Sequence, residues 1–283
     1  MRPENAINLV DYPLDKLTST VGNALIVSCR EQLAESGSCL LPDFIDSRAV
    51  QLALKESLDQ LDQAHQVDHE FSYDDVDDQT LAVSPDSLPV DHPRHHKSLT
   101  KIRFLARDLL PASNPLRVIH GWPQLAEFIG SVIGKVIFPS ACPLSSCVVT
   151  VAEEGELQDW HFDGADFIVT IMLEEPSSGG NFEYVTDLRS SYGIDDFDGI
   201  SKVFNGDRRR VQVPNIAPGT LTLFKGRFNL HRAAPVDPGS RRVMAVLSFE
   251  TEPNKTGSAA FLKLFYGRSL GDLPVAERLV QFS

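Results

Sequence analysis

Residues 159–173 read DWHFDGADFIVTIML, a tryptophan and two metal-ligand side chains followed by a run of apolar and β-branched residues. A short run of this kind is typical of a buried strand. Alternate side chains of a strand lie on the same face, so His161 and Asp163 can reach one ion while Phe162 points into packing. A neutral imidazole and a carboxylate are suitable ligands for a divalent transition metal. The stretch therefore predicts a metal site at the mouth of a β-structure.

The rest of the chain after Cys142 also has the texture of β-structure. Short β-branched or aromatic runs are separated by Gly, Pro, Asp and Asn, and they read CVVTVAEEG, DFIVTIMLEE, GNFEYV, RRRVQV, GTLTLFKG, NLHRAAPV and RRVMAVLSFET. Many short strands after a helical flank predict a sandwich or barrel with helices packed outside it. We therefore expect an α+β protein.

The flank that precedes these strands is predicted to be mainly helical. Apolar residues at four-residue steps predict one helix over about residues 14–35 and a second helix with Ser47 as its N-cap. An early proline and a late glycine predict a third helix at Pro123–Gly134. The periodic pattern dissolves over residues 65–97, which are rich in Asp, Ser, Pro and His. A long segment of this kind predicts a lid or binding loop.

The chain is expected to form a single domain over residues 1–283. It is 42% hydrophobic, which is enough to bury a substantial core, and no Pro/Gly/Ser linker separates its halves. Within the domain we expect a helical buttress with the lid loop over residues 1–139 and the β core over residues 140–252. A closing segment over residues 253–283 would complete it.

The charge and the cysteines narrow the classes of partner. There are 39 acidic and 26 basic side chains, so the formal net charge is -13. An acidic surface repels phosphate backbones and anionic lipid, so we expect a small-molecule substrate and neither nucleic acid nor membrane as partner. The four cysteines include no C-x-x-C pair and are expected to be reduced. No signal-peptide or membrane-spanning stretch is evident, so we expect a cytoplasmic protein, with homo-oligomerisation left open.

Two further residues extend the predicted metal site. His231 lies on a predicted strand in GRFNLHRAAPV, and two histidines with one carboxylate form the facial triad of non-heme Fe(II) oxygenases, which leaves three coordination positions open. Arg242 follows eleven residues later, where alternation puts it on one face of its strand with Met244, Val246 and Ser248. A guanidinium fork suits the distal carboxylate of 2-oxoglutarate. Arg241 is the alternative if the register of this strand shifts by one.

H-x-D, a distal histidine and an arginine eleven residues beyond it resemble the Fe(II)/2-oxoglutarate-dependent dioxygenases with a double-stranded β-helix. The runs DHPRHH, SGGNFEYV, NGDRRRVQV, PGTLTLFKGRFNLHRAAPV, VLSFETEP and FYGR are similar to one subfamily, the small enzymes that halogenate or hydroxylate free amino acids. The resemblance extends from GSCLLPDFID to FYGRS. It implies Fe(II), 2-oxoglutarate and O2 as cofactors, with His161, Asp163 and His231 on the iron and Arg242 on 2-oxoglutarate.

Asp163 bears on which of these reactions the chain performs. In the halogenases that it resembles, the carboxylate position is Gly or Ala and chloride occupies the vacated site on iron. The carboxylate at this position therefore implies hydroxylation of an unactivated C–H bond, with release of succinate and CO2. The expected substrate is a free amino acid or a small molecule derived from one. The same iron chemistry can also desaturate or cyclise a substrate.

Four residues are candidates for binding that substrate. Arg94 in HPRHH is a candidate for its carboxylate, with a surface arginine as the alternative. Asp166 could pair with its ammonium group, or could cap a turn. Trp160 flanks the metal ligands and is either a substrate contact or a packing residue. Ser248, on the predicted face of Arg242, is the fourth.

Two rival interpretations use the same residues. Two histidines and a carboxylate with an open position also describe catalytic zinc, and hence a hydrolase or isomerase on a cupin-like barrel. A jelly-roll binding module without chemistry is the other rival. Arg242 argues against the zinc enzyme, because such a site has no need for a clamp for a cofactor carboxylate. The binding module would require the three matching spacings to be a coincidence.

Overall fold

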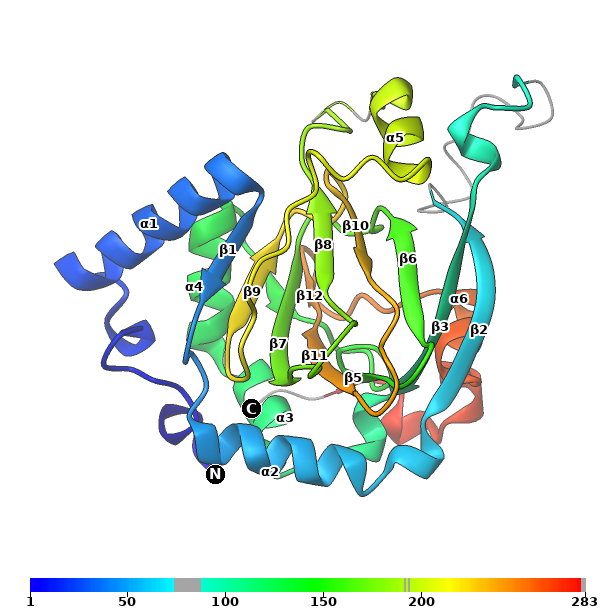
Figure 1. Ribbon diagram of the computed structural model, residues 1–283. Helices are drawn as coiled ribbons and strands as arrows, with labels where there is room; N and C mark the ends of the chain where they lie inside the picture. The colour runs from blue at the N-terminus through cyan, green and yellow to red at the C-terminus, as the bar shows by residue number, and fades with distance from the viewer. Residues whose placement is uncertain (74–87, 191, 193, 281–283) are drawn as a thin grey trace.

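The protein is built on a curled antiparallel sheet (Figure 1). The computed structural model describes residues 1–73, 88–190, 192 and 194–280. Nine strands follow the order β1-β9-β7-β11-β5-β3-β6-β10-β8, and β2, which pairs with β3 off this path, is the tenth. The sheet curls so that its two ends approach each other. Phe182 and Tyr184 of β8 lie with their ring centroids 5.1 and 5.2 Å from that of Phe224 on β9, near the other end of the order.

The strands of this sheet come from most of the chain. They are β1 (Ser38–Leu41), β2 (His65–Ser72), β3 (Lys97–Leu105), β5 (Cys147–Ala152), β6 (Leu157–His161), β7 (Ile168–Glu174), β8 (Phe182–Val185), β9 (Leu221–Phe224), β10 (Leu230–Ala233) and β11 (Arg242–Leu247). A separate two-stranded ladder joins β4 (Phe138–Pro139) to β12 (Phe249–Glu250). The helices are α1 (Thr20–Ser36), α2 (Ser47–Leu58), α3 (Pro115–His120), α4 (Pro123–Ile133), α5 (Phe197–Phe204) and α6 (Ala259–Tyr266).

Strand alternation divides the sheet into a helix-covered face and an inner face. On β11, Val243, Ala245 and Leu247 are buried in the main hydrophobic cluster together with residues of α1, α2, α3 and α4. The side chains between them, beginning with Arg242, therefore face the inside of the barrel. The same holds for β9, where Leu221 and Leu223 join the cluster and the alternate residues point inward. The helices thus buttress one face and leave the other for chemistry.

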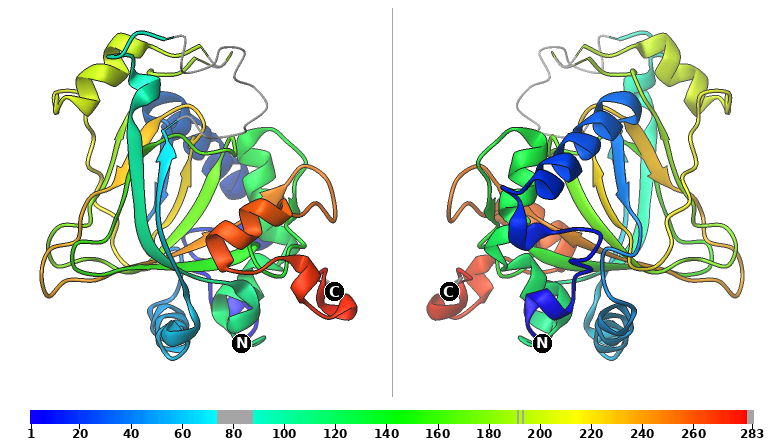
Figure 2. Two further views of the ribbon diagram at one scale, coloured as in Figure 1. Left: turned by 90° about the vertical axis from the view of Figure 1, so that its right-hand side faces the viewer. Right: turned by 90° about the vertical axis from the view of Figure 1, so that its left-hand side faces the viewer.

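The two ends of the barrel are also distinct. Figure 2 shows α5 at one end and α2 at the other. Strand β6 points toward the end that carries α5, so its last residue, His161, lies there (Figure 1). In the part of the chain that the structure describes, no helix combines the length and the apolar character needed to cross a membrane.

The α+β architecture predicted from the sequence is confirmed, with local corrections. The first helix begins at Thr20 after Ser19, whose side chain accepts a hydrogen bond from the backbone N–H of Gly22, and the second has Asp46 as its N-cap in place of Ser47. The third runs over Pro123–Ile133 and ends at Gly134 in the left-handed conformation, as expected.

The sheet also reaches beyond the segment assigned to the β core. Strands β1, β2 and β3 all precede residue 140. Residues 65–72, expected in a loop, form β2 and pair with β3 from His65 opposite Phe104 to Ser72 opposite Lys97. Because β2 is an edge strand with mostly exposed side chains, its polar composition conceals it. The aspartates at 74, 75, 77 and 78 lie outside the described residues.

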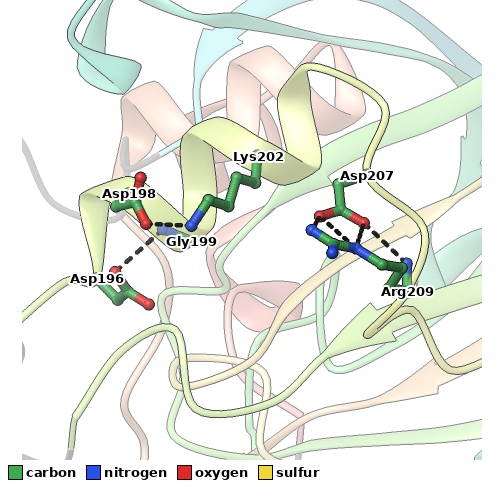
Figure 3. A network of polar contacts seen from close by, with 6 residues as sticks. All are labelled: Asp196, Asp198, Gly199, Lys202, Asp207 and Arg209. Atoms are coloured by element: carbon green, nitrogen blue, oxygen red, sulfur yellow. Dashed lines mark hydrogen bonds and ion pairs between the residues drawn. The ribbon is translucent and has the colours of Figure 1, made fainter.

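RRRVQV does not form the strand that its composition predicts. Asp207 accepts a hydrogen bond from the backbone N–H of Arg209 at 3.0 Å and pairs with its guanidinium, which turns the chain (Figure 3). Only Gln212 makes an isolated bridge, to Tyr184 on β8. Local side-chain hydrogen bonds thus compete successfully with strand pairing.

The buried face predicts a large cost for truncating a core residue. Ile171 on β7 is fully buried in the main cluster. Ile171→Ala is expected to lower the free energy of unfolding by about 3 kcal/mol, because it leaves a cavity in a packed interior. Urea unfolding followed by circular dichroism measures the loss. Val21→Ala, at a position 63% exposed on α1, is the control and should change it by less than about 0.5 kcal/mol. Equal losses in the two variants would contradict this assignment of the core.

Candidate active site

The structure brings the three predicted metal ligands together. His161 ends β6 and pairs across the ladder with His231 of β10, so that their ring centroids are 4.2 Å apart. The Asp163 carboxylate lies 3.6 Å from His161 Nε2 and 3.1 Å from His231 Nε2. One ligand atom of each residue lies within 4.8 Å of those of the other two, and among the described residues this is the one cluster of its kind.

The placement of Asp163 differs from the sequence prediction in one respect. The strand ends at His161, and Asp163 lies in the loop beyond it. The alternation of a strand therefore does not direct its carboxylate toward the histidines. The backbone N–H of Asp163 donates to the carbonyl of Gly226 at 3.1 Å, and this cross-loop contact holds the residue.

Backbone carbonyls orient both imidazoles. The Nδ1 of His161 lies 2.7 Å from the carbonyl oxygen of Asp159, and the Nδ1 of His231 lies 2.9 Å from that of Asn229. A carbonyl can only accept, so each Nδ1 carries a hydrogen and each Nε2 is turned toward the cluster. This orientation is the one that a metal ion requires.

The electrostatics of the cluster favour a cation between the three groups. Burial by itself would raise the pKa of the Asp163 carboxyl, but the facing imidazoles of His231 and His161 hold that pKa well below its usual range. Burial disfavours the charged form of His161, yet the hydrogen bond and charge of Asp163 raise its pKa above the ordinary value. A buried carboxylate that remains ionised demands a neighbouring positive charge, which protons or a metal ion can supply.

Gly226 makes room for the carboxylate. A Cβ atom at this position would lie 2.0 Å from Asp163 Oδ2 and 2.9 Å from Asp163 Cβ, closer than atoms can approach. The packing role of Gly226 comes from the meeting of two loops that are distant in the chain.

Arg242 lies on the inner face, as its register predicts. It is buried, donates from Nη2 to Met244 Sδ at 3.2 Å, and its Nε has no hydrogen-bond partner within the described residues. Burial lowers its pKa to about 10. Arg241, the alternative, is engaged elsewhere, because its Nη2 lies 2.8 Å from a carboxylate oxygen of Glu174. A buried guanidinium with an unsatisfied N–H is costly unless an anion joins it.

A cavity of about 210 Å³ lies beside Arg242. Phe182 lines it, and the ring centroid of Phe182 is 5.8 Å from that of His231. One aromatic side chain therefore borders both the cavity and the metal-ligand cluster. The arrangement suits a short ligand that carries an anionic group at the Arg242 end.

Two of the predicted substrate-binding residues lie near α5. Arg94 is in a short 3-10 helix, Pro93–His95, and its Cζ lies 5.3 Å from the ring centroid of Phe197. Trp160 is buried in a second hydrophobic cluster with residues of α5, and the guanidinium of Arg232 lies 4.8 Å from its ring centroid. These contacts favour the packing interpretation of Trp160.

The other two predicted substrate-binding residues have partners of their own. Asp166 pairs with Lys135 at 2.8 Å and with Arg227 at 2.9 Å, so its carboxylate links two loops. The Ser248 hydroxyl donates to the carbonyl of Ser145 at 2.9 Å, just after β11 ends. Both side chains thus contribute to local structure.

Comparison with known proteins identifies the family. The sequence profile of the family described as Halogenase D matches residues 91–261, more than half of the chain and all three candidate metal ligands. The chain belongs to the halogenase D family. This membership confirms the resemblance drawn from the sequence motifs. No curated protein sequence matches the chain.

Solved structures show the fold that this member of the halogenase D family adopts. The non-heme alpha-ketoglutarate-dependent carbocyclase SnoK of nogalamycin biosynthesis superposes with a TM-score of 0.53 at 12% identity, over 90% of this chain and 96% of SnoK. The epimerase SnoN, determined with Fe3+ and alpha-ketoglutarate, gives 0.52 at 14% identity over 89% and 91%. EctD from S. alaskensis, determined with 2-oxoglutarate and 5-hydroxyectoine, gives 0.51 at 14% identity over 89% and 86%. The expected double-stranded β-helix is confirmed.

Gly226 offers a direct test of the cluster geometry. Gly226→Ala is expected to weaken Co(II) binding by at least about tenfold, because the added methyl group must displace the Asp163 carboxylate. Titration of the metal-free protein with Co(II), followed by visible absorption, measures the affinity. Gly271→Ala is the matched control, since its Cβ would meet only the Ser269 Oγ at 3.5 Å. Unchanged Co(II) affinity in Gly226→Ala would show that the carboxylate is not a ligand.

Proposed function

We propose that this protein is an Fe(II)- and 2-oxoglutarate-dependent oxygenase that hydroxylates an unactivated C–H bond of a free amino acid or of a small molecule derived from one. The observation that carries the proposal is the pairing of two sites on one inner face. A cluster of two histidines and one carboxylate and a cavity lined by a buried arginine are linked by Phe182, which lines the cavity and lies with its ring centroid 5.8 Å from that of His231. Membership of the halogenase D family supports the same chemistry.

The donor set fits ferrous iron. His161, Asp163 and His231 would hold the ion on one face and leave the opposite positions for 2-oxoglutarate and O2. Together these supply an oxidant that converts C–H to C–OH while 2-oxoglutarate becomes succinate and CO2. The carbonyls of Asp159 and Asn229 hold the Nδ1 side of each imidazole, so that each Nε2 is turned toward the site.

Arg242 would select and orient 2-oxoglutarate. Its guanidinium can form two parallel hydrogen bonds with the distal carboxylate, and its burial strengthens them. Phe182, Tyr184 and Phe224 surround the approach to His231 with aromatic rings and exclude water from that side. The rival zinc hydrolase has no use for this arginine.

Asp163 favours hydroxylation over halogenation. Its carboxylate fills the third position of the cluster, 3.1 Å from His231 Nε2, and the Gly226 backbone packs against it. A halide ligand would need that position. The second candidate function is desaturation or cyclisation by the same iron chemistry. It is favoured by the carbocyclase and the epimerase that share this fold.

The role of Arg242 is tested by a pair of neighbouring variants. Arg242→Met is expected to weaken 2-oxoglutarate binding by about 30-fold to 100-fold, the cost of losing hydrogen bonds to a charged group. Anaerobic titration of the Fe(II) protein, read from a charge-transfer band at about 500 nm, measures the affinity. Arg241→Met should change it by less than about threefold, because Arg241 serves Glu174. A larger effect of Arg241→Met would transfer the clamp to that residue.

The reaction is tested by product analysis. A screen of the proteinogenic amino acids for succinate release should find a substrate that gains one oxygen atom and no chlorine, even in buffer rich in chloride. Mass spectrometry of the product distinguishes the outcomes. His161→Ala, which removes a ligand, is the control and should abolish the product. A chlorinated product from the unmutated protein would refute this role of Asp163, and loss of two hydrogens would favour desaturation or cyclisation.

A further inference from the structure

We propose that Arg189 is a positioning residue that holds Asp163 in place as a metal ligand, and that Asp195 holds Arg189. The inference rests on the metal site of the proposed function. Asp163 lies in a loop, so no ladder hydrogen bonds fix its carboxylate. The residues that contact its two flanks must supply that order.

Arg189 and Asp195 form a buried bidentate ion pair. The Nε of Arg189 lies 2.6 Å from Asp195 Oδ1, and its Nη2 lies 3.1 Å from Oδ2. The two side chains are only 7% and 2% exposed. The pair closes a hairpin, because residues 189 and 195 also form a backbone bridge. Such a pair is expensive to bury, so it holds one geometry rather than contributing net stability.

The guanidinium of Arg189 lies against the residue between the two metal ligands. Its Cζ is 3.8 Å from the ring centroid of Phe162, which is 3% exposed. The backbone N–H of Phe162 donates to the carbonyl of Tyr73 at 3.1 Å. Phe162 is therefore held from both its ring and its backbone. Phe162 is the residue between His161 and Asp163, so the orientation of its backbone sets the position of the Asp163 backbone.

Arg189 also contacts the loop on the other side of Asp163. Its Nη1 lies 3.5 Å from the carbonyl oxygen of Arg227. The preceding residue, Gly226, accepts the backbone N–H of Asp163 and packs against its carboxylate. One side chain thus touches the two segments between which the ligand is held.

The Asp195 side of this ladder leads directly into α5. Asp196, next to Asp195, accepts the backbone N–H of Gly199 at 3.0 Å and so caps this helix (Figure 3). Its own backbone N–H donates to the carbonyl of Leu188 at 2.8 Å. The carboxylate of Asp195 is therefore presented from a fixed backbone, as a positioning role requires.

The chain provides a matched control for a cation over an aromatic ring. Arg208 lies with its Cζ 5.8 Å from the Trp160 ring centroid and pairs with the buried Glu183 at 2.6 Å. It contacts a ring and a carboxylate as Arg189 does, but from a more exposed position, since its side chain is 44% exposed against 7% for Arg189. Its partners are not residues that flank Asp163.

The experiment measures metal binding, and this readout does not depend on enzyme activity. Co(II) is titrated into metal-free full-length protein, and visible absorption gives both the affinity and the coordination spectrum. Arg189→Met is expected to weaken Co(II) binding by about tenfold and to alter the bands, since a loosened carboxylate changes the ligand field. Asp195→Asn, nearly isosteric, should weaken it less. Arg189→Lys keeps a cation over Phe162 and should recover part of the loss.

The remaining variants separate positioning from general stability. Arg208→Met should bind Co(II) within about twofold of the unmutated protein even if its melting temperature falls. The double variant Arg189→Met/Asp195→Asn should bind like Arg189→Met alone, because the pair acts as one unit. If Arg189→Met fails to fold, Asp195→Asn carries the test.

Three results would overturn the inference. Wild-type Co(II) affinity and spectrum in both Arg189→Met and Asp195→Asn would do so. An equal loss in Arg208→Met would also do so, because it would indicate a general effect of destabilisation. Failure of the unmutated protein to bind Co(II) would overturn the proposed metal site itself, and with it this role.

Discussion

The chemistry of this protein depends on one costly interaction, a largely buried carboxylate held between two imidazoles. Asp163 remains ionised only because His161 and His231 face it, and a metal ion would satisfy the same demand. Taking a carboxylate out of water is unfavourable unless it gains a compensating charge and hydrogen bonds. The surrounding structure supplies both. Two ladder partners place the histidines, two carbonyls turn them, and a glycine admits the carboxylate.

The curled sheet offsets the free-energy cost of this interaction by placing apolar packing on one face and polar groups on the other. One face buries aliphatic side chains against four helices, and this packing supplies the stability. The inner face can therefore carry polar groups that lower stability but perform chemistry, such as the buried Arg242 with its unsatisfied Nε. The strict alternation of a strand keeps the two sets apart over the whole of β11. The same strands thus supply core residues on one face and site residues on the other.

The metal-ligand cluster lies at the end of the barrel where β6 stops, so one of its three residues is outside the strands. Strand pairing orders His161 and His231, whereas Asp163 depends on loops that approach from elsewhere in the chain. Asp163 is the position that separates hydroxylation from halogenation in the proposed chemistry. Of the three ligand residues it is the one that strand pairing does not constrain. The side chains packed around it, from the hairpin at residues 189–195 and the turn at Gly226, are where such a site can be tuned.

The sequence by itself was sufficient for the fold class and for the inward register of Arg242. It also named the three residues that the structure brings together, His161, Asp163 and His231, whose role as metal ligands stays a prediction. The fold class and the face of Arg242 follow from the periods of regular structure, whereas the ligand residues were recognised by their types and by their resemblance to a known motif. It was insufficient for β2, whose exposed edge carries no apolar alternation, and for RRRVQV, where Asp207 turns the chain. Trp160, Asp166 and Ser248 were candidates for substrate contacts, and the structure shows each of them with a partner inside the protein.

What only the tertiary structure decided is how the loops meet. The contacts of Gly226 with Asp163 and of Arg189 with Phe162 join residues tens of positions apart, and neither pair shares a strand or helix period. Local patterns record which face of an element a side chain occupies, because that follows from backbone geometry alone. Which loop lies against which depends on the closure of the whole sheet, and no short stretch of sequence contains that information.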